Sequence, residues 1–354
     1  MKISIIVPVY KAEKHLSATL DSLIGQTHAD LEIICVNDGS PDGCGAILAD
    51  YACRDALISV IEQANAGVSV ARNTGIARAT GDILMFVDAD DTLVPHACAR
   101  VAAIFEQQQP EMLTFGLECD PPEAAPASLR RELAPADKTY EGFAPDLLFK
   151  EYARPYACRT AITRAFAQRE HVGFEPGLAL AEDQVFYFAT YPFSARTVLS
   201  SEKLYVYRMN DESATHVVID GREALLKKLD SHLTAIEAIL RIWDERDMRD
   251  FCAAELLEWC LDFVMLDIGK LPPADQRTQW KRLIDALDAH FQQPCEDFAA
   301  RRPTKACVAD IRTAIGKTAD APAVAKAHKI RYYLMRRGFA RCAERVLMKL
   351  GIVK

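Results

Sequence analysis

The N-terminal quarter of the chain alternates between short apolar runs and segments in which apolar or small residues recur at helical spacing. Nearly continuous apolar runs occupy residues 3–9, 31–36, 57–61 and 83–87. Such runs are typical of parallel strands that are covered on both faces. Residues with the spacing of a helix face lie between them, at 16–24, 47–51 and 68–79. The alternation predicts an α/β fold with an open, mostly parallel sheet flanked by helices.

The pattern changes in the second third of the chain. Residues 120–135 are rich in Pro and Ala, which predicts an exposed loop or linker. From Arg222 onward the apolar residues recur at helical spacing, and they predict a C-terminal helical region. We expect its core to include the following residues: Leu256, Leu257, Trp259, Cys260 and Phe263.

Polar side chains follow three of the predicted strands where each strand ends. These ends are residues 8–10 (PVY), 37–40 (NDGS) and 88–91 (DADD). In an open parallel sheet, ligands bind beyond the carboxyl ends of the strands, so the three segments should meet at one edge. Three acids at one strand tip repel one another unless a cation lies between them. A divalent metal that carries a diphosphate suits such oxygen ligands.

The acidic segment has two other possible interpretations. Asp90 or Asp91 could instead cap a helix predicted over residues 92–105, since Asp is a favoured N-cap residue. An EF-hand loop that begins at Asp88 is excluded, because it requires Gly and Glu where the chain has Leu93 and Ala99.

Composition and missing motifs exclude several function classes. The turn after the first strand, residues 8–13 (PVYKAE), contains no glycine, so the dinucleotide-binding fingerprint is absent. The P-loop and G-x-S-x-G motifs are absent too. A net charge of −8 argues against general nucleic-acid binding.

The cysteines and the N-terminus predict a cytoplasmic protein. The eleven Cys residues form no C-x-x-C pair, and we expect them to be reduced thiols. The apolar run at residues 3–9 is followed by charged residues where a signal-peptide cleavage site would lie, so it reads as a strand. No apolar run is long enough to span a bilayer.

Four segments in one order resemble the family-2 inverting glycosyltransferases of the GT-A fold, of the kind that builds bacterial polysaccharide or lipopolysaccharide. They are residues 4–10 (SIIVPVY), 36–40 (VNDGS), 65–73 (NAGVSVARN) and 86–91 (FVDADD). The resemblance implies a UDP-sugar donor, a divalent cation (Mn²⁺ or Mg²⁺), and a hydroxyl acceptor on a glycan or a lipid-linked saccharide.

The resemblance also implies roles for individual residues on the donor side. Asp38 matches the acid that receives the uracil or ribose. Arg72 matches the arginine that reaches the uracil, and Asn73 lies beside it. The strand tip that lines the base comprises Pro8, Val9 and Tyr10. For Asp38 the structural alternative is an Asx turn, and for Arg72 it is a surface arginine on a helix.

The acidic segment takes its roles from the same resemblance. Asp88 matches the ribose-side acid and a second candidate metal ligand. Asp90 matches the metal ligand, and Ala89 separates the two. Asp91 either assists them or only caps the next helix.

On the acceptor side, residues 174–177 (FEPG) and 180–186 (LAEDQVF) resemble the segment that supplies the catalytic base. Asp183 matches that base, and Glu182 matches a neighbour that contacts or orients the acceptor. The alternative is a pair of acids in the first turn of a helix, where the helix dipole favours negative charge. The family's tryptophan-bearing segment is represented here by residues 155–156 (PY), so the acceptor platform is expected to differ.

Residues 204–216 resemble the family's tyrosine-arginine strand and the polar loop after it. By this resemblance Arg208 approaches the diphosphate. His216 is a further candidate metal ligand or a loop contact, although a single histidine is more often neither.

We therefore expect a GT-A domain over residues 1–220, followed by a helical region over 221–354. The resemblance makes residues 1–118 the nucleotide-sugar half and 136–220 the acceptor half.

Residues 326–354 carry nine Lys and Arg against one Glu, a net charge of +8, which leaves −16 on the first 325 residues. This basic amphipathic end either lies on the anionic inner face of the cytoplasmic membrane or packs on the acidic body.

The expected function is metal-assisted transfer of a sugar from a UDP-sugar, with inversion and with an Asp base. Two other functions stay open. One is a catalytically inactive protein that binds a sugar nucleotide or acts as a scaffold. The other is a sugar nucleotidyltransferase, which would need a glycine-rich, basic phosphate loop near the first strand.

Overall fold

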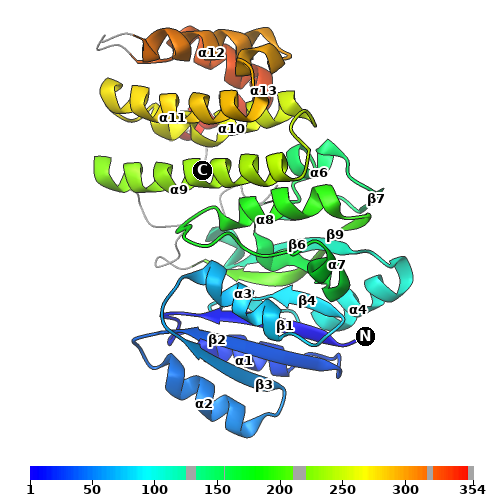
Figure 1. Cartoon of the computed structure of the whole chain (residues 1–354). Helices are drawn as coiled ribbons and strands as arrows, with labels where there is room; N and C mark the ends of the chain where they lie inside the picture. Colours follow the sequence, from blue (N-terminus) through cyan, green and yellow to red (C-terminus); the bar gives the residue numbers. More distant parts are fainter. Residues whose placement is uncertain (125–132, 155, 210–220, 317–321, 350–354) are drawn as a thin grey trace. The chain divides into compact units, whose positions relative to one another are not determined.

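The computed structural model describes residues 1–354 except 125–132, 155, 210–220, 317–321 and 350–354, and leaves out the side chains of 340, 341 and 343–349. The chain forms two compact units, Met1–Val217 and Val218–Lys354 (Figure 1). The boundary expected at residue 220 and the candidate ligand His216 both lie outside the described residues.

Four parallel strands form the first half of the sheet in the first unit. They are β1 (Ile3–Val9), β2 (Leu31–Asp38), β3 (Ile58–Gln63) and β4 (Ile83–Phe86). Strands β2 and β4 flank β1, and β3 extends the sheet beyond β2. Every residue of β1 and β4 is buried, which explains their continuous apolar sequence. Three helices connect these strands, namely α1 (Leu16–Ile24), α2 (Cys44–Arg54) and α3 (Val68–Arg78) (Figure 1).

The second half of the sheet mixes strand directions. Its strands are β5 (Thr92–Leu93), β6 (Met112–Asp120), β7 (Lys138–Glu141), β8 (Thr160–Thr163) and β9 (Arg196–Arg208). The order is β3-β2-β1-β4-β8-β6-β9-β5, and β7 also pairs with β9. Strand β4, the last of the parallel strands, pairs with β8, which is antiparallel to it. The carboxyl end of β4 therefore lies where the two halves of the sheet join.

The helix expected to begin at Thr92 begins only at Ala97. Helix α4 (Ala97–Gln108) has His96 as its N-cap residue. Thr92 and Leu93 form β5 instead and pair with β9. The alternative interpretation, in which Asp90 or Asp91 caps this helix, is therefore ruled out. A strand of two residues has no periodicity that a sequence pattern could detect.

The later helices of the first unit are α6 (Pro145–Phe149), α7 (Arg164–Arg169) and α8 (Glu182–Thr190). An aromatic cluster holds α8 to the sheet. Phe186 of α8 stacks on Phe174 with ring centroids 4.6 Å apart, and Phe174 meets Phe86 of β4 edge-on at 5.2 Å. This cluster fixes the start of α8 near the end of β4.

The second unit is helical, as expected. Its α-helices are α9 (Arg222–Glu245), α10 (Ala253–Ile268), α11 (Pro273–Phe291), α12 (Arg302–Ile315) and α13 (Lys326–Lys349). Leu256, Leu257 and Cys260 are buried in its core. Among the described residues, we find no helix whose length and apolarity would allow it to span a membrane.

Helix α13 joins this unit through its first half. Tyr332 is fully buried, and its hydroxyl donates a hydrogen bond of 2.8 Å to the carbonyl oxygen of Glu258 on α10. Arg336 forms ion pairs with Glu258 (3.0 Å) and Asp262 (2.9 Å). The helix kinks at Gly338, whose φ of 74° lies in the left-handed region. The first half of the basic end therefore packs on its own unit.

Candidate active site

Asp38, at the end of β2, organises the loop before α3. Its side chain is 2 % exposed and accepts hydrogen bonds from the backbone N–H groups of Ala66 and Gly67, each 2.8 Å. Gln63 adds a third bond of 2.7 Å from its side-chain amide. The Asx-type turn at this strand end belongs to Asn37 instead, whose Oδ1 accepts the N–H of Ser40. Asp38 therefore shapes the entry to α3.

The end of β1 lies beside the end of β2. Pro8 and Val9 are buried, whereas Tyr10 is 44 % exposed. The backbone N–H of Lys11 donates to Ser40 Oγ at 2.7 Å, which ties the two strand ends together. Of the three residues expected to line a base, Tyr10 is the one whose side chain is open to solvent.

The acidic segment after β4 forms a fixed turn. The N–H of Asp91 donates to the carbonyl oxygen of Asp88 at 3.1 Å, and the carbonyl oxygen of buried Ala89 accepts the hydroxyl of Thr19 at 2.9 Å. The side chain of Asp88 is 32 % exposed, and Asp90 is half-buried. The turn thus presents two partly exposed carboxylates.

Asp91 is buried and fully engaged by β9. Its two oxygens accept the hydroxyl of Tyr205 (2.6 Å) and the N–H of Arg208 (2.7 Å). Burial, reinforced by the charges of Asp88 and Asp90, raises the pKa of Asp91 well above its usual range. Asp91 anchors the acidic turn to β9, a role that was not expected from the sequence.

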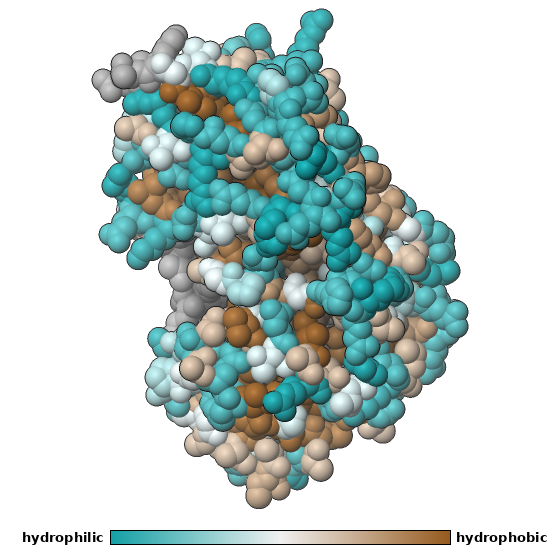
Figure 2. All heavy atoms as spheres, in the orientation of Figure 1, coloured by the Kyte–Doolittle hydropathy of each residue, from teal (hydrophilic) through white to brown (hydrophobic). Residues whose placement is uncertain are grey.

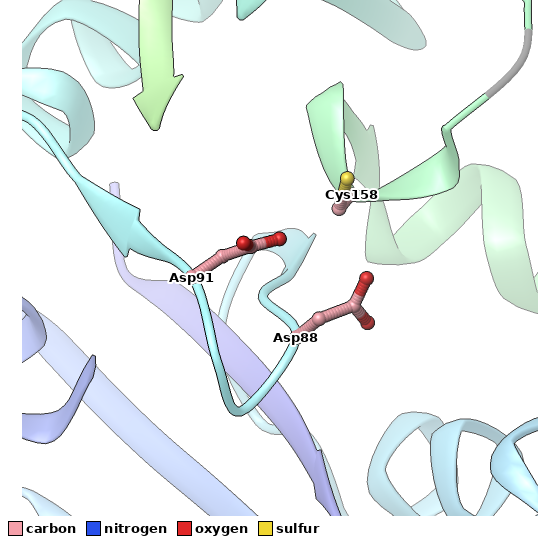
Figure 3. A group of neighbouring side chains, drawn as sticks. All are labelled: Asp88, Asp91 and Cys158. Carbon is pink, nitrogen blue, oxygen red and sulfur yellow. The ribbon is translucent and has the colours of Figure 1, made fainter. Parts of the chain in front are cut away.

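Cys158 completes a group that sequence patterns did not identify. Its thiol and one carboxylate oxygen each of Asp88 and Asp91 all lie within 4.8 Å of one another. Figure 3 shows the three side chains turned toward the same space, with Cys158 coming from the segment just before β8. Burial raises the pKa of this thiol well above its usual range, so it remains protonated.

Arg72 connects the donor and acceptor sides of the expected site. The residue is 5 % exposed. Its Nη2 lies 2.8 Å from a carboxylate oxygen of Asp88, and its Nη1 lies 2.9 Å from one of Glu182. The structural alternative, a surface arginine on a helix, is therefore ruled out. The contacts explain how the acidic turn and α8, far apart in the sequence, come together.

Asn73, the neighbour of Arg72, makes a different connection. Its side-chain amide donates to the carbonyl oxygen of Phe174 and accepts the N–H of the same residue, both at 2.8 Å. The amide is therefore used to hold the segment before α8.

Asp183, the expected base, is the second residue of α8. Its Oδ2 accepts the backbone N–H of Tyr156 at 2.9 Å. Burial, with a further contribution from the charge of Glu182, raises the pKa of Asp183 from 3.8 to about 6. The ring centroid of Tyr156 lies 5.7 Å from that of Tyr207. Tyr156 belongs to the segment that the resemblance matches to the family's tryptophan-bearing segment, and Tyr207 was not among the expected site residues.

Arg208 lies at the end of β9 and contacts α1. Its Nη1 lies 2.8 Å from Nδ1 of His15, which must be the unprotonated nitrogen in order to accept this hydrogen bond. His15 was not among the expected site residues, because a histidine before a helix carries no motif. Its contact brings the start of α1 to the same strand end as the acidic turn.

The first unit matches a known family. Residues 4–152 match the model of the family described as Glycosyl transferase family 2. The uncharacterized glycosyltransferase EpsJ of Bacillus subtilis is 38% identical over 221 residues, which cover 61% of this chain and 63% of EpsJ. The poly(ribitol-phosphate) beta-glucosyltransferase of Bacillus spizizenii is 31% identical over 216 residues, which cover 58% of this chain and 32% of that protein. The chain thus spans less than two thirds of either relative.

A solved structure shares the fold. The crystal structure of Staphylococcus aureus TarS 1-349 in complex with UDP-GlcNAc superposes with a TM-score of 0.70 at 20% sequence identity, and covers 89% of this chain and 88% of that one. The GT-A fold with a C-terminal helical region, expected from the sequence, is thereby confirmed.

Proposed function

Because the chain carries a glycosyl transferase family 2 domain, we propose that it transfers a sugar from a UDP-sugar to a hydroxyl of a glycan or lipid-linked acceptor, with inversion at the anomeric carbon. The observation that carries this proposal is the contact of Arg72 with both Asp88 and Glu182. It brings an acidic strand end suited to a sugar diphosphate next to Asp183, which is suited to a base. The Bacillus spizizenii relative, a beta-glucosyltransferase acting on poly(ribitol-phosphate), supports a polysaccharide-type acceptor.

Asp183 acts as the base in this proposal. Its carboxylate removes the proton from the acceptor hydroxyl as the oxygen bonds to the anomeric carbon and the bond to the leaving UDP breaks on the opposite face. A pKa of about 6 keeps Asp183 ionised at neutral pH and makes it a stronger base than an ordinary aspartate. A base placed in this way typically contributes about 10²–10⁴ in rate.

We assign a divalent cation to the acidic turn. Asp90 and Asp88 offer partly exposed oxygen ligands of the kind that Mn²⁺ and Mg²⁺ prefer. Asp91 is committed to Tyr205 and Arg208 and is the weakest candidate ligand of the three. When bound, the cation stabilises the negative charge on the leaving diphosphate.

The remaining donor contacts are assigned to residues 1–118 and the acceptor contacts to 136–220. On the donor side, Tyr10 at the end of β1 is open to solvent, and Asp38 at the end of β2 shapes the loop before α3. Arg208, at the end of β9, is the one donor contact assigned outside residues 1–118, and its backbone N–H bonds to Asp91 of the acidic turn. Tyr156 lies next to Asp183, and Tyr156 together with Tyr207, which packs against it, offers an aromatic surface for an acceptor.

We also propose that α13 contacts an anionic membrane surface from the cytoplasmic side. Ile330, Leu334 and Phe339 of this helix are 50%, 37% and 80% exposed. Figure 2 shows apolar surface as separate brown areas among hydrophilic side chains on the face that it draws. Exposed apolar residues on a helix rich in Lys and Arg are the pattern of an interfacial helix.

The test is a calorimetric titration of UDP with and without Mn²⁺, followed by a panel of UDP-sugars with hydrolysis monitored. Tight, metal-dependent UDP binding together with slow hydrolysis of one UDP-sugar supports the proposal. Binding without hydrolysis or transfer favours the inactive, nucleotide-binding alternative. Release of a sugar phosphate together with a nucleoside triphosphate, when pyrophosphate is added, favours the nucleotidyltransferase.

A further inference from the structure

Arg72 places one guanidinium between carboxylates of two separate elements. Asp88 belongs to the turn after β4, and Glu182 begins α8, 110 residues beyond Arg72. Each Nη atom serves one of the two carboxylates, at 2.8 and 2.9 Å. A lysine ammonium is a single point charge and does not reproduce this two-sided contact.

The surroundings hold this guanidinium in place. Its Cζ lies 4.9 Å from the ring centroid of Phe174, and the same ring stacks on Phe186 of α8. Asn73 fixes the backbone of Phe174 from the adjacent position on α3. Arg72 therefore packs against the segment that leads into α8, as well as pairing with its two carboxylates.

Arg72 compensates negative charge at the start of α8. Glu182 and Asp183 are adjacent in the first turn of α8, and the charge of Glu182 disfavours ionisation of Asp183. A buried or half-buried carboxylate without a partner is costly, so Glu182 depends on Arg72 for its charge compensation. The charged and polar groups that face Asp183 are Glu182 and the N–H of Gln184 from α8, Tyr156 with its N–H from the segment before β8, and Arg72 from α3.

We propose that Arg72 is a positioning residue that, by binding Glu182 and Asp88 together, compensates the charge beside Asp183 and so sets the pH range in which that base works. The inference rests on the proposed function. It differs from the role that the family resemblance gives Arg72, which is to reach the uracil. Its Nε–H, which is buried and has no partner among the described residues, remains a donor that a ligand could still satisfy.

The experiment compares the pH dependence of kcat/KM for wild type, Arg72→Gln, Glu182→Gln and the double variant. In Arg72→Gln the acid limb should move upward by about one pH unit, since an opposite charge nearby favours the ionised acid. In Glu182→Gln it should move downward. In the double variant it should return toward the wild-type position, because the uncompensated charge is gone. A surface control, Arg100→Gln, breaks the exposed pair with Glu202 and should leave the profile unchanged.

Two results would overturn the inference. One is an acid limb of Arg72→Gln that matches wild type while the donor KM rises, which is what a uracil-reading arginine predicts. The other is a double variant whose acid limb in the pH profile of kcat/KM lies at the same pH as that of Arg72→Gln. If Arg72→Gln does not fold, Arg72→Lys keeps the charge but reaches one partner, and its acid limb should lie above that of wild type by less than one pH unit. An acid limb of Arg72→Lys equal to that of wild type would then overturn the inference.

A second measurement works without any substrate. The carboxyl ¹³C signal of Asp183, assigned by its loss in Asp183→Asn, can be titrated in the unliganded protein. An upward movement of its midpoint in Arg72→Gln, reversed in the double variant, supports the inference even if no donor is turned over. Failure of transfer in wild type would then count against the proposed function alone.

Discussion

The side-chain amide of Asn73 and the backbone of Phe174 form a reciprocal pair of hydrogen bonds, both 2.8 Å long, across 101 residues of sequence. The aromatic ring of Phe174 packs against the guanidinium of Arg72 and stacks on the ring of Phe186. This pair therefore connects α3, which carries Arg72, to α8, which carries the proposed base.

Replacing Asn73 by Ala should destabilise the first unit and slow transfer. Both backbone groups of Phe174 would lose their partner, at a cost of about 1–3 kcal/mol in the free energy of unfolding. Urea unfolding measures the loss. Arg78→Ala, at an exposed position of the same helix, is the matched control and should change stability by less than about 0.5 kcal/mol. Equal stability of the two variants would show that the reciprocal pair contributes nothing.

Asp183→Asn should lower the rate of transfer by about 10²–10⁴ and leave the affinity for UDP close to that of wild type. The amide keeps the shape of the side chain and can still accept the N–H of Tyr156, but it cannot take a proton from an acceptor. Turnover by product detection and UDP affinity by calorimetry separate the two effects. Unchanged turnover would remove Asp183 as the base.

The pKa of Asp183, about 6 in the folded chain against an ordinary value of 3.8, also predicts a pH-dependent stability. Because folding favours the protonated acid, its contribution to stability is present below about pH 4 and is lost as pH rises through about 6. Asp183→Asn should therefore unfold at higher urea than wild type at pH 7.5, with a gain of at most about 3 kcal/mol. The gain should vanish near pH 4, and an equal gain at both values would contradict the raised pKa.

Asp90→Ala should weaken the binding of UDP in the presence of Mn²⁺ and leave the metal-free affinity unchanged. The reason is the loss of a partly exposed oxygen ligand from the turn after β4. Calorimetry with and without Mn²⁺ gives both affinities, and Asp30→Ala, an exposed acid before β2, serves as the control. Equal UDP affinity with and without Mn²⁺ in wild type would argue against the metal assignment.

Phe339→Glu should reduce binding to vesicles that contain anionic lipid without changing the melting temperature. The side chain is 80% exposed, so its replacement disturbs little packing. Co-sedimentation with vesicles tests the change, and Phe251→Glu, at a residue that is 43% exposed and lies outside α13, is the control. Deletion of the whole segment 326–354 is a poorer test, because it removes buried Tyr332. If the intact protein does not bind such vesicles, the membrane proposal fails.

The sequence predicted the parallel half of the sheet because a strand that is buried on both faces is a run of consecutive apolar residues. The strands β1 and β4 are buried throughout and β2 nearly so, whereas the edge strand β3 is only partly buried and was marked by its β-branched residues. The ends of β1, β2 and β4 carry the polar motifs. The acids Asp38, Asp88 and Asp90 could be selected for the same reason, since polar residues at the ends of buried strands stand out from their surroundings. The C-terminal helices were visible in their 3.6-residue periodicity.

The tertiary structure decided which of these residues are neighbours. Nothing near Arg72 in the sequence indicates Glu182, and nothing near Asp91 indicates Tyr205, because ion pairs and hydrogen bonds between distant residues leave no periodic pattern. Strand β5 is too short for a pattern, so the sequence left Asp91 either as an assisting acid or as a helix cap and did not indicate its role as an anchor to β9. Local sequence thus determined the strands, the helices and the candidate acids. Chain packing determined how those acids are paired, because charge compensation in a buried site depends on distances that only the folded chain sets.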